Sequence, residues 1–479
     1  MEQVSIRQVA AWTGGHYEGP DLPVGGVEID SRRAGRGSLF VALRGSHVDG
    51  HDYLGEAFAS GAGAVLAHRA DAVHAHRTMG HPVVRVADTR RALADLAAGY
   101  RRSLGLTVIG ITGSNGKTTT KEMLRLLLGP QAAASPQSFN NEVGVPLTLL
   151  GADRSHKYCI VELGTNAPGE IAALSEIAQP QVGVVLNVGE SHLHGLGSVQ
   201  GVAREKFALV DALGADGCAV LNWDDLHTRE MIGRAGSYVV SFGTWPDADV
   251  FAGDIRTSGY SLSFRIFNRK RISMRLIGVH NVHNALAAAS VAMWLGVEPF
   301  EVCERLPKFR PAPMRMAVEE IGRIRLINDA YNANPRSMAA ALHEMSYRGG
   351  GRRIAVLGDM HELGHEADAF HAEIGARVAR SRIDVLWAIG PLSEATARAA
   401  RDAGLRSVHW SPDVTQAMRR PPVRVKSRDV VLFKASRAMR LERVYDAIRD
   451  DIVGRRRERG GNGNGTGNST SNSNSNRSS

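Results

Sequence analysis

The sequence has few cysteines, few aromatic residues and no long apolar run. Its three cysteines, Cys159, Cys218 and Cys303, lie far apart and form no CxxC pair. This spacing argues against a disulfide framework and against a cysteine-based zinc site, and it is typical of a reducing compartment. No stretch approaches the roughly 18 consecutive apolar residues of a membrane-spanning helix, and the N-terminal residues lack the apolar core of a signal peptide. We therefore expect a cytoplasmic protein without a membrane span.

The chain carries a net charge of +9 at pH 7, but its basic residues are spread along the whole length. Aromatic residues make up 6% of the chain and do not alternate with basic ones. Such alternation is expected where a protein stacks single-stranded nucleic acid. A basic chain serves acidic small molecules such as nucleotides equally well. We therefore expect no nucleic-acid partner.

The chain of 479 residues allows two to four domains at about 150 residues each. Short apolar runs alternate with helical patterns, which is typical of α/β domains with mostly parallel, doubly wound sheets. Residues 251–277 alternate like antiparallel strands, and "LPKFRPAPMRM" marks a boundary near residue 311, followed by four strand-like runs. We predict a small α/β N-terminal domain over 1–105, a central P-loop-type domain over 106–310, a Rossmann-like domain over 311–459 and a disordered Gly/Asn/Ser tail over 460–479.

Residues 110–121, "GITGSNGKTTTK", place glycines and a Lys-Thr pair at a predicted strand-to-helix turn. There, backbone N–H groups and the positive helix end bind an anion, Lys117 adds a charge, and the Thr118 hydroxyl is offered to Mg²⁺. The standard GxxxxGK[ST] spacing requires glycine where Ile111 stands, so the pattern is incomplete. A flexible turn is the alternative, but it rarely also supplies Lys-Thr at a helix start. We predict that the ATP phosphates bind to Gly113, Ser114, Asn115, Gly116, Lys117, Thr118 and Thr119.

Two further predicted strands end in groups that can bind a metal ion. "YCIVELG" places Glu162 near its carboxyl end, and "VGVVLNVGESHLHG" places Glu190, His192 and His194 just past another. Ligands of open parallel sheets bind at the carboxyl ends of the strands. We therefore expect Thr118, Glu162 and His192 to converge on Mg²⁺–ATP. The alternative for His-x-His is an ordinary loop, and no cysteine supports a zinc site.

Lys206 lies in the predicted helix "SVQGVAREKFALV". From the sequence alone we interpret it as a solvated charge. A lysine with a lowered pKa could instead react with CO₂ and become an anionic carbamate able to ligate a second metal ion.

Polar clusters follow three predicted strands of the last block, at 328–337, 358–364 and 434–442. Groups of these kinds hold a ribose and a peptide substrate. Any one could merely cap a helix, with Asn334 before Pro335 and Ser436 as the plausible caps. Three clusters at the same end of one sheet make capping alone an insufficient explanation. The candidates are Asp329, Asn332, Asn334, Asp359, Lys434, Ser436 and Arg437.

Together these residues resemble the Mur ligase family, the ATP-dependent amide-forming enzymes of peptidoglycan synthesis. "TGSNGKTTTK" is similar to the family's TGTNGKT-type loop, which typically lacks the same glycine. Residues 29–67 resemble the family's uridine-nucleotide-binding domain, and the resemblance covers the chain up to the tail. "YNANPRSM", "LGDMHELG" and "FKASRAMRLE" resemble the members that add D-alanyl-D-alanine to UDP-N-acetylmuramoyl-tripeptide. One departure is Met314, which stands where many members have glycine.

The resemblance implies a role for each candidate. Asn281 and Asn284 would contact adenine, Arg315 the γ-phosphate and Asp329 the ATP ribose. Thr118 and Glu162 would bind Mg²⁺, while His192 and a carbamylated Lys206 would hold a second Mg²⁺ near the acceptor carboxylate. Ser31, Arg32 and Arg44 would face the uridine diphosphate. The dipeptide would contact Asn332, Asn334, Asp359 and Ser436. The catalytic residues would be Lys117, His192, Lys206 and Arg315.

The function implied by the resemblance is an ATP-dependent, ADP-forming carboxylate–amine ligase that works through an acyl phosphate. Separately from the resemblance, we expect a monomer. A related Mur ligase that adds the third amino acid is one alternative, although its typical DNPR motif is absent here. Folylpolyglutamate synthetase shares the ATP chemistry but lacks the uridine-binding domain. A nucleotide-gated binding protein without catalysis is the alternative from another class.

Overall fold

The structure is a computed structural model that describes residues 1–135, 138–347 and 350–461. The chain divides into two compact units, Met1–Ala312 with Glu362–Ala367, and Pro313–His361 with the chain from Asp368 onward. Of the predicted tail, residues 460 and 461 belong to the last helix, α17 (Glu442–Gly461), and residues 462–479 lie outside the described part. Over the described residues, the helices are too short or too polar to cross a membrane.

The N-terminal part of the first unit contains a four-stranded parallel sheet in the order β3-β4-β5-β6. The apolar runs of β4 and β5 are completely buried, as expected for parallel strands. The elements are β1 (Val4–Ser5), α1 (Ile6–Thr13), β2 (Pro23–Val24), β3 (Val27–Glu28), η1 (Ser31–Arg33), β4 (Leu39–Val41), η2 (Gly50–Tyr53), α2 (Leu54–Ala59), β5 (Ala64–Ala67), α3 (Ala70–Thr78), β6 (Val83–Arg85) and α4 (Thr89–Leu104).

The rest of the first unit contains a nine-stranded sheet in the order β15-β14-β13-β12-β11-β10-β7-β9-β8. Its pairs from β8 to β13 are parallel, and β13, β14 and β15 pair in antiparallel fashion, as predicted for residues 251–277. The strands are β7 (Thr107–Thr112), β8 (Ala132–Ala134), β9 (Tyr158–Glu162), β10 (Val182–Val185), β11 (Cys218–Asn222), β12 (Tyr238–Gly243), β13 (Val250–Ser258), β14 (Ser261–Ile266) and β15 (Arg271–Met274). The helices and 3₁₀ turns are α5 (Lys117–Leu128), η3 (Gly129–Gln131), α6 (Gly144–Leu150), α7 (Glu170–Ala178), α8 (Leu193–Leu196), α9 (Val199–Asp211), α10 (Leu226–Ile232), α11 (His280–Trp294), α12 (Pro299–Arg305), η4 (Leu306–Lys308) and η5 (Gly364–Glu366).

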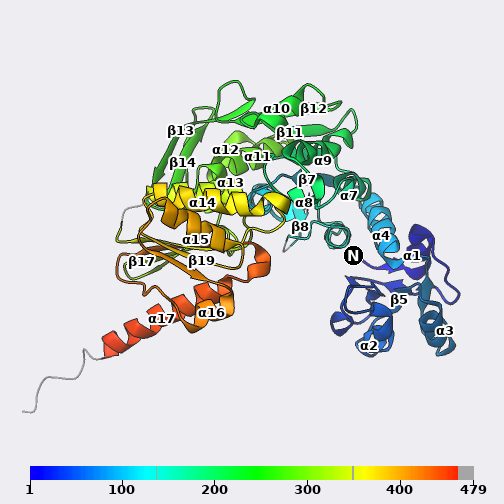
Figure 1. Cartoon of the computed structure of the whole chain (residues 1–479). Helices are drawn as coiled ribbons and strands as arrows, with labels where there is room; N and C mark the ends of the chain where they lie inside the picture. Colours follow the sequence, from blue (N-terminus) through cyan, green and yellow to red (C-terminus); the bar gives the residue numbers. More distant parts are fainter. Residues whose placement is uncertain (136–137, 348–349, 462–479) are drawn as a thin grey trace, which may run out of the picture. The chain divides into compact units, whose positions relative to one another are not determined.

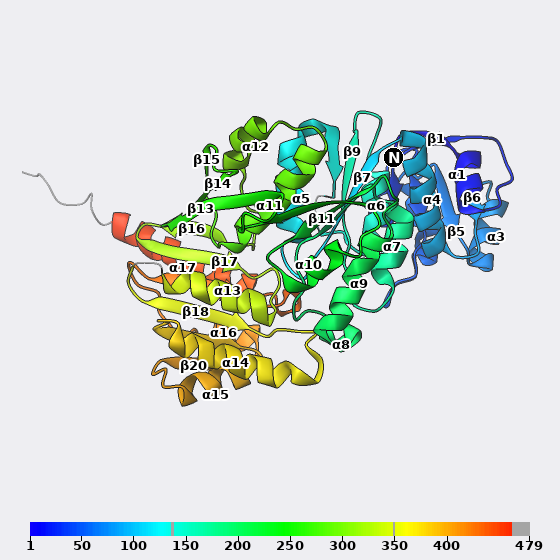
Figure 2. The same cartoon turned by 90° about the horizontal axis from the view of Figure 1, so that it is seen from above.

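Helices cover both faces of this sheet. Alternate residues of a strand point to opposite faces, so Ile109 and Ile111 of β7 pack into the core that contains α5 and α11. Val108 packs into the core that contains α6 and α7. Figure 2 shows α5 and α11 on one side of the strands and α6, α7 and α9 on the other. The carboxyl ends of the parallel neighbours β9, β7 and β10 therefore share one edge, which lies between these layers.

The second unit contains a six-stranded sheet in the order β16-β17-β21-β18-β19-β20, parallel except for the edge strand β16. Helices α13, α14 and α15 cover one face, and α16 and α17 cover the other (Figure 1). The four predicted strands form β17, β18, β19 and β21, and the structure adds β16 and β20. The elements are β16 (Ala317–Ile321), β17 (Ile324–Asp329), α13 (Pro335–Ser346), β18 (Arg353–Gly358), α14 (Ala367–Arg380), β19 (Val385–Ile389), α15 (Ser393–Asp402), β20 (Val408–Ser411), α16 (Val414–Arg419), β21 (Val430–Lys434) and η6 (Arg437–Met439).

These sheets confirm the predicted fold class of a small α/β domain, a central, mostly parallel sheet and a Rossmann-like third domain. The predicted boundaries at 105 and 310 stay predictions.

Candidate active site

The glycine-rich loop lies between β7 and α5, as predicted. Ile111 belongs to β7, and its completely buried side chain packs into the core, so the strand needs an apolar residue there rather than glycine. Gly116, at a φ of 91°, has the left-handed backbone that favours glycine. A Cβ at this position would lie 2.2 Å from Asn284 Oδ1. The loop is therefore short and tightly packed, beginning at Gly113 instead of Ile111.

The loop that follows β10 supports the phosphate loop. Asn187 donates to the Asn115 carbonyl at 3.1 Å and accepts from the Asn115 N–H at 3.0 Å. Gly189 N–H donates to the Ser114 hydroxyl at 3.0 Å, and the Ser191 hydroxyl lies 2.8 Å from that of Ser114. The residues predicted from the sequence of this loop are Glu190, His192 and His194, and they do not include Asn187 and Ser191. Only the position of Asn187 and Ser191 in the sequence could have indicated a role, because both follow a strand that pairs with β7.

Lys117 and Thr118 begin α5 at the mouth of the loop. Lys117 Nζ donates to the Gly113 carbonyl at 2.6 Å, so its charge lies against the loop backbone. The Thr118 hydroxyl donates to Glu162 Oε2 at 3.0 Å and lies 3.0 Å from the Ser138 hydroxyl. Parallel pairing of β7 with β9 sets Ile111 beside Glu162, which brings this carboxylate to the start of α5. The structure thus brings Thr118 and Glu162 together.

The metal site stays a prediction. Over the described residues, no three His, Cys, Asp or Glu side chains are grouped to hold a metal ion. Thr118 and Glu162 nevertheless supply neighbouring buried oxygens, the donor type that suits Mg²⁺, with further ligands to come from phosphate and water. His192 has a φ of 55°, and its Nδ1 lies 2.6 Å from Glu362 Oε2. Its contact with a metal ion stays a prediction.

The interpretation of Lys206 as a solvated charge is wrong. Its side chain is 1% exposed, on the inner face of α9. Burial lowers the pKa of Lys206 well below its usual value, and the charge of Lys117 lowers it further, while Glu205 opposes the shift. The neighbouring Glu205 carboxylate accepts 2.7 Å hydrogen bonds from the backbone of Gly169 and of Ile171. Lys206 is thus a buried amine near the phosphate loop.

Asn281 and Asn284 lie in the first turns of α11, which packs against α5. Both are buried. Asn284 Nδ2 donates to Asn281 Oδ1 at 2.9 Å, and Asn281 Nδ2 donates to the Ile277 carbonyl at 2.6 Å. These bonds fix the position of the Asn284 amide, whose oxygen lies against Gly116. The predicted contacts of both amides with adenine stay predictions.

In the second unit, Asp329 and Lys434 end the paired strands β17 and β21. Their side chains form a 2.6 Å ion pair, and Lys434 also donates to the Asn332 carbonyl at 2.9 Å. Asp329 Oδ1 accepts from the Met316 N–H at 3.0 Å. The Arg315 guanidinium lies over the Tyr331 ring at 4.0 Å from its centroid. Asp329, the proposed ribose ligand, is therefore held from both sides.

The dipeptide candidates follow the carboxyl ends of β17, β18 and β21, as predicted. Asn334 is the N-cap of α13 and forms a capping box with Ser337, which confirms the capping alternative for this residue. Asp359 is 1% exposed, and its Oδ1 accepts from Ser393 N–H at 2.7 Å and from the Ser393 hydroxyl at 2.6 Å. The Ser436 hydroxyl accepts from His361 N–H at 2.9 Å. Asn332 is exposed, and all dipeptide contacts stay predictions.

The uridine candidates lie in the N-terminal part of the first unit. Ser31 is buried at the start of η1, while Arg32 is exposed and pairs with Asp30 at 2.7 Å. Arg44 is exposed, and its carbonyl accepts from Arg90 at 3.1 Å. Their contacts with a uridine diphosphate remain predictions.

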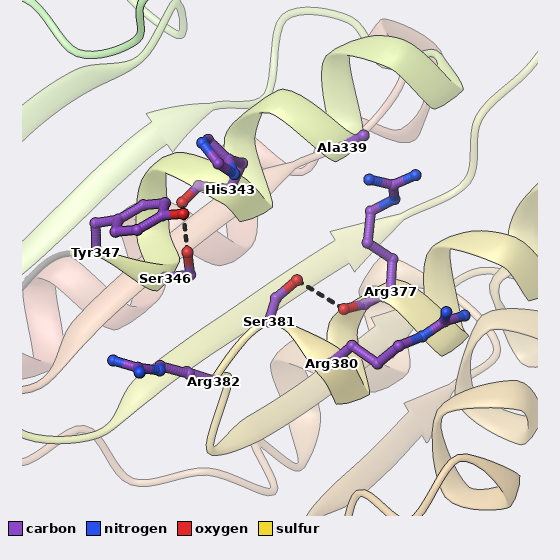
Figure 3. Close-up of a pocket in the computed structure, with 8 residues that line it drawn as sticks. All are labelled: Ala339, His343, Ser346, Tyr347, Arg377, Arg380, Ser381 and Arg382. Atoms are coloured by element: carbon purple, nitrogen blue, oxygen red, sulfur yellow. Dashed lines mark hydrogen bonds between the residues drawn. The ribbon is translucent and has the colours of Figure 1, made fainter.

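A pocket of about 310 Å³ lies between α13 and α14 in the second unit (Figure 3). It lies at the C-terminal ends of these helices and so at the amino ends of β18 and β19, the opposite edge from Asp329 and Asp359. Cations at helix C-termini are favoured by the helix dipole without any ligand. We therefore assign it no part in the site. It is lined by Ala339, His343, Ser346, Tyr347, Arg377, Arg380, Ser381 and Arg382.

Comparison with known proteins finds matches that together cover most of the chain. Family models match at residues 23–101 (Mur ligase family, catalytic domain), 111–292 (Mur ligase middle domain) and 314–437 (Mur ligase, glutamate ligase domain). A UDP-N-acetylmuramoyl-tripeptide–D-alanyl-D-alanine ligase of Bacillus subtilis is 34% identical over 460 residues, 93% of this chain and 98% of the relative.

Solved structures of similar proteins match this chain over most of its length. A crystal structure of MurF from Acinetobacter baumannii has a TM-score of 0.84 and 30% identity, covering 94% of this chain and 99% of that one. MurF ligase from Thermotoga maritima, solved with ADP, has a TM-score of 0.78 and 30% identity, covering 90% of this chain and 99% of that one. The matches and the fold lead to one conclusion: the chain belongs to the Mur ligase family.

Proposed function

We propose that the chain joins D-alanyl-D-alanine to UDP-N-acetylmuramoyl-tripeptide in peptidoglycan precursor synthesis, with ADP and phosphate as the other products. Mur ligases are ATP-dependent, ADP-forming ligases, so the chain is an enzyme of this type. The Bacillus subtilis relative bears the name of this reaction. In the structure, the contact of Thr118 with Glu162 beside the phosphate loop carries the proposal, because it sets two Mg²⁺-type ligands where the phosphates of ATP would lie.

The residues around the loop fit ATP and Mg²⁺. The first turn of α5 and Lys117 would compensate the phosphate charge. Thr118 and Glu162 would hold Mg²⁺, which when bound neutralises charge on the transferred phosphoryl group. We propose Arg315 as the ligand of the γ-phosphate and Asp329 as that of the ribose. The adenine would lie against Asn281 and Asn284.

The reaction has two steps, both governed by positioning and electrostatics. An oxygen of the tripeptide's terminal carboxylate attacks the γ-phosphorus, the bond to ADP breaks, and an acyl phosphate forms. The amine of D-alanyl-D-alanine then attacks the acyl carbon and loses a proton. Phosphate departs with the oxygen that came from the carboxylate, which leaves an amide.

We propose that Lys206 works as a carbamate. Its amine adds to CO₂ and releases a proton, and the resulting N-carboxylate would hold a second Mg²⁺ together with His192. Burial and the lowered pKa support this proposal, because only the neutral amine reacts. Activity of Lys206→Ala should be low and should recover with added short carboxylates. Full activity of the variant without rescue would contradict it.

The two peptide substrates have separate candidate contacts. We propose Ser31, Arg32 and Arg44 for the uridine diphosphate. For the dipeptide, we propose that Asn332 contacts it directly. The capping and loop bonds of Asn334, Asp359 and Ser436 would shape its pocket. A cytoplasmic location fits the three free, buried cysteines.

A substrate panel tests the proposal. Phosphate release from ATP should require UDP-N-acetylmuramoyl-tripeptide and D-alanyl-D-alanine together. Release with UDP-N-acetylmuramoyl-dipeptide and a free diamino acid would assign the chain to the ligase for the third residue instead.

A further inference from the structure

Lys121 is a cation enclosed in the second turn of α5. Its side chain is 0% exposed and is among the largest completely buried side chains of the described residues. A buried ammonium group is costly unless anions and hydrogen-bond acceptors surround it. The partners of Lys121 therefore indicate why a charge is kept there.

Its partners connect α5 with two other segments. Lys121 Nζ donates to the Ser135 carbonyl at 2.7 Å and lies 3.3 Å from the Ser135 hydroxyl. It also forms ion pairs of 3.3 Å with Glu122 Oε1 and with Glu162 Oε1. Glu122 has a second cation in Arg125, at 3.0 Å. Glu162 is 1% exposed and therefore shares the buried environment of Lys121.

Lys121 and Thr118 hold the two oxygens of one carboxylate. The two residues are three positions apart on α5 and so lie on the same face of the helix. Thr118 bonds to Glu162 Oε2 at 3.0 Å, while Lys121 lies 3.3 Å from Oε1. The first contact is a hydrogen bond and the second an ion pair, and a quarter turn of the carboxylate plane would lengthen both. Oε2 is thereby kept beside the Thr118 hydroxyl.

We propose that Lys121 is a positioning residue for the divalent cation of the nucleotide. It touches neither the cation nor the phosphates, and acts by holding Glu162 so that Oε2 and the Thr118 hydroxyl face the same ion. This inference rests on the proposed ATP site and adds a residue to it. A purely structural role, in which Lys121 only ties α5 to Ser135, is the competing explanation.

Cation binding separates the two explanations. Mn²⁺ binding to the protein–ADP complex, followed by electron paramagnetic resonance, should weaken about tenfold or more in Lys121→Met. The half-saturating Mg²⁺ concentration for turnover should rise by a similar factor, while the KM of D-alanyl-D-alanine stays within twofold. The matched control is Arg125→Met, which removes an exposed cation that pairs with Glu122 from the same helix and should leave all three values unchanged. Unchanged Mn²⁺ and Mg²⁺ values in folded Lys121→Met would overturn the proposal.

A double variant covers the case in which Lys121→Met does not fold. Lys121→Met combined with Glu162→Gln leaves no unpaired charge between these two positions. If Lys121 acts through Glu162, the double variant should bind Mn²⁺–ADP as weakly as Glu162→Gln alone. A further loss in the double variant would show an independent role and overturn the proposal. Because Mn²⁺–ADP binding needs neither peptide substrate, the result stands even if the proposed substrates are wrong.

Discussion

The Thr118 hydroxyl donates a 3.0 Å hydrogen bond to Glu162 Oε2 and so joins the start of α5 to the end of β9. The contact forms because β7, which leads into the phosphate loop, pairs in parallel with β9. A helix start that suits phosphate and a carboxylate that suits Mg²⁺ thereby share one edge of the sheet.

Removing the Thr118 hydroxyl should slow phosphoryl transfer. Thr118→Val keeps the shape of the side chain but loses the oxygen, and we expect kcat to fall about 100-fold, as for loss of a group that stabilises transition-state charge. Thr118→Ser retains the oxygen and should remain within several-fold of the parent. Steady-state phosphate release checks both. Equal rates for the Val and Ser variants would show that the hydroxyl has no part in the reaction.

Met314 should strain the chain where glycine would not. Its φ is 59°, in the left-handed region, and its carbonyl accepts from Tyr331 N–H at 3.2 Å. This conformation costs a residue with a Cβ about 1–2 kcal/mol. Met314→Gly should therefore unfold at an equal or higher urea concentration, and the β-branched Met314→Val at a lower one. If Met314→Gly unfolded at a lower urea concentration than the parent, contacts of the Met314 side chain would outweigh the strain.

Lys206 should make stability depend on pH. Because burial lowers its pKa in the folded state, the unfolded chain binds more protons between that lowered pKa and the ordinary value of 10.5. The cost of burying Lys206 is thus greatest at low pH and disappears as pH rises towards 10.5. In CO₂-free buffer without nucleotide, Lys206→Met should be more stable than the parent at neutral pH. Its advantage in free energy of unfolding should be smaller at pH 9.5. Urea unfolding at several pH values measures this, and a gap that widens with pH contradicts it.

The cysteines should be unreactive in the folded protein. Burial raises the pKa of Cys159 and of Cys218 to about 12, and Cys303 is also buried with a raised pKa. The reactive thiolate is therefore scarce at pH 8, and access is closed. A thiol reagent should label none of the three until denaturant is added. Rapid labelling of the native protein would show that one of these cores opens readily.

The sequence predicted the framework of the site because its signals are local. The strand "LTVIGIT", the helix start at Lys117 and the strand that ends at Glu162 follow from apolar runs and turn residues, and parallel pairing brings their ends together. The glycine expected at Ile111 is unnecessary because this residue lies in β7, with its side chain in the core.

What the sequence could not show is burial that depends on distant partners. The sequence pattern predicts a solvated charge at Lys206 and gives no sign of the burial of Lys121, but both side chains are buried, on α9 and α5. The edge strand β16 (Ala317–Ile321) is mostly half-buried, so its apolar signal is weak. Asp359 has no local sign of its contact with Ser393, which lies 34 residues away.

The fate of one oxygen tests the proposed reaction most directly. UDP-N-acetylmuramoyl-tripeptide labelled with ¹⁸O in its terminal carboxylate is incubated with the enzyme, ATP, Mg²⁺ and D-alanyl-D-alanine, and the released phosphate is analysed by mass spectrometry. An acyl phosphate requires that one ¹⁸O appear in each phosphate formed from labelled carboxylate, together with a peptide product longer by D-alanyl-D-alanine. Phosphate released without ¹⁸O would show that ATP is hydrolysed by water, and it would contradict transfer to the peptide carboxylate.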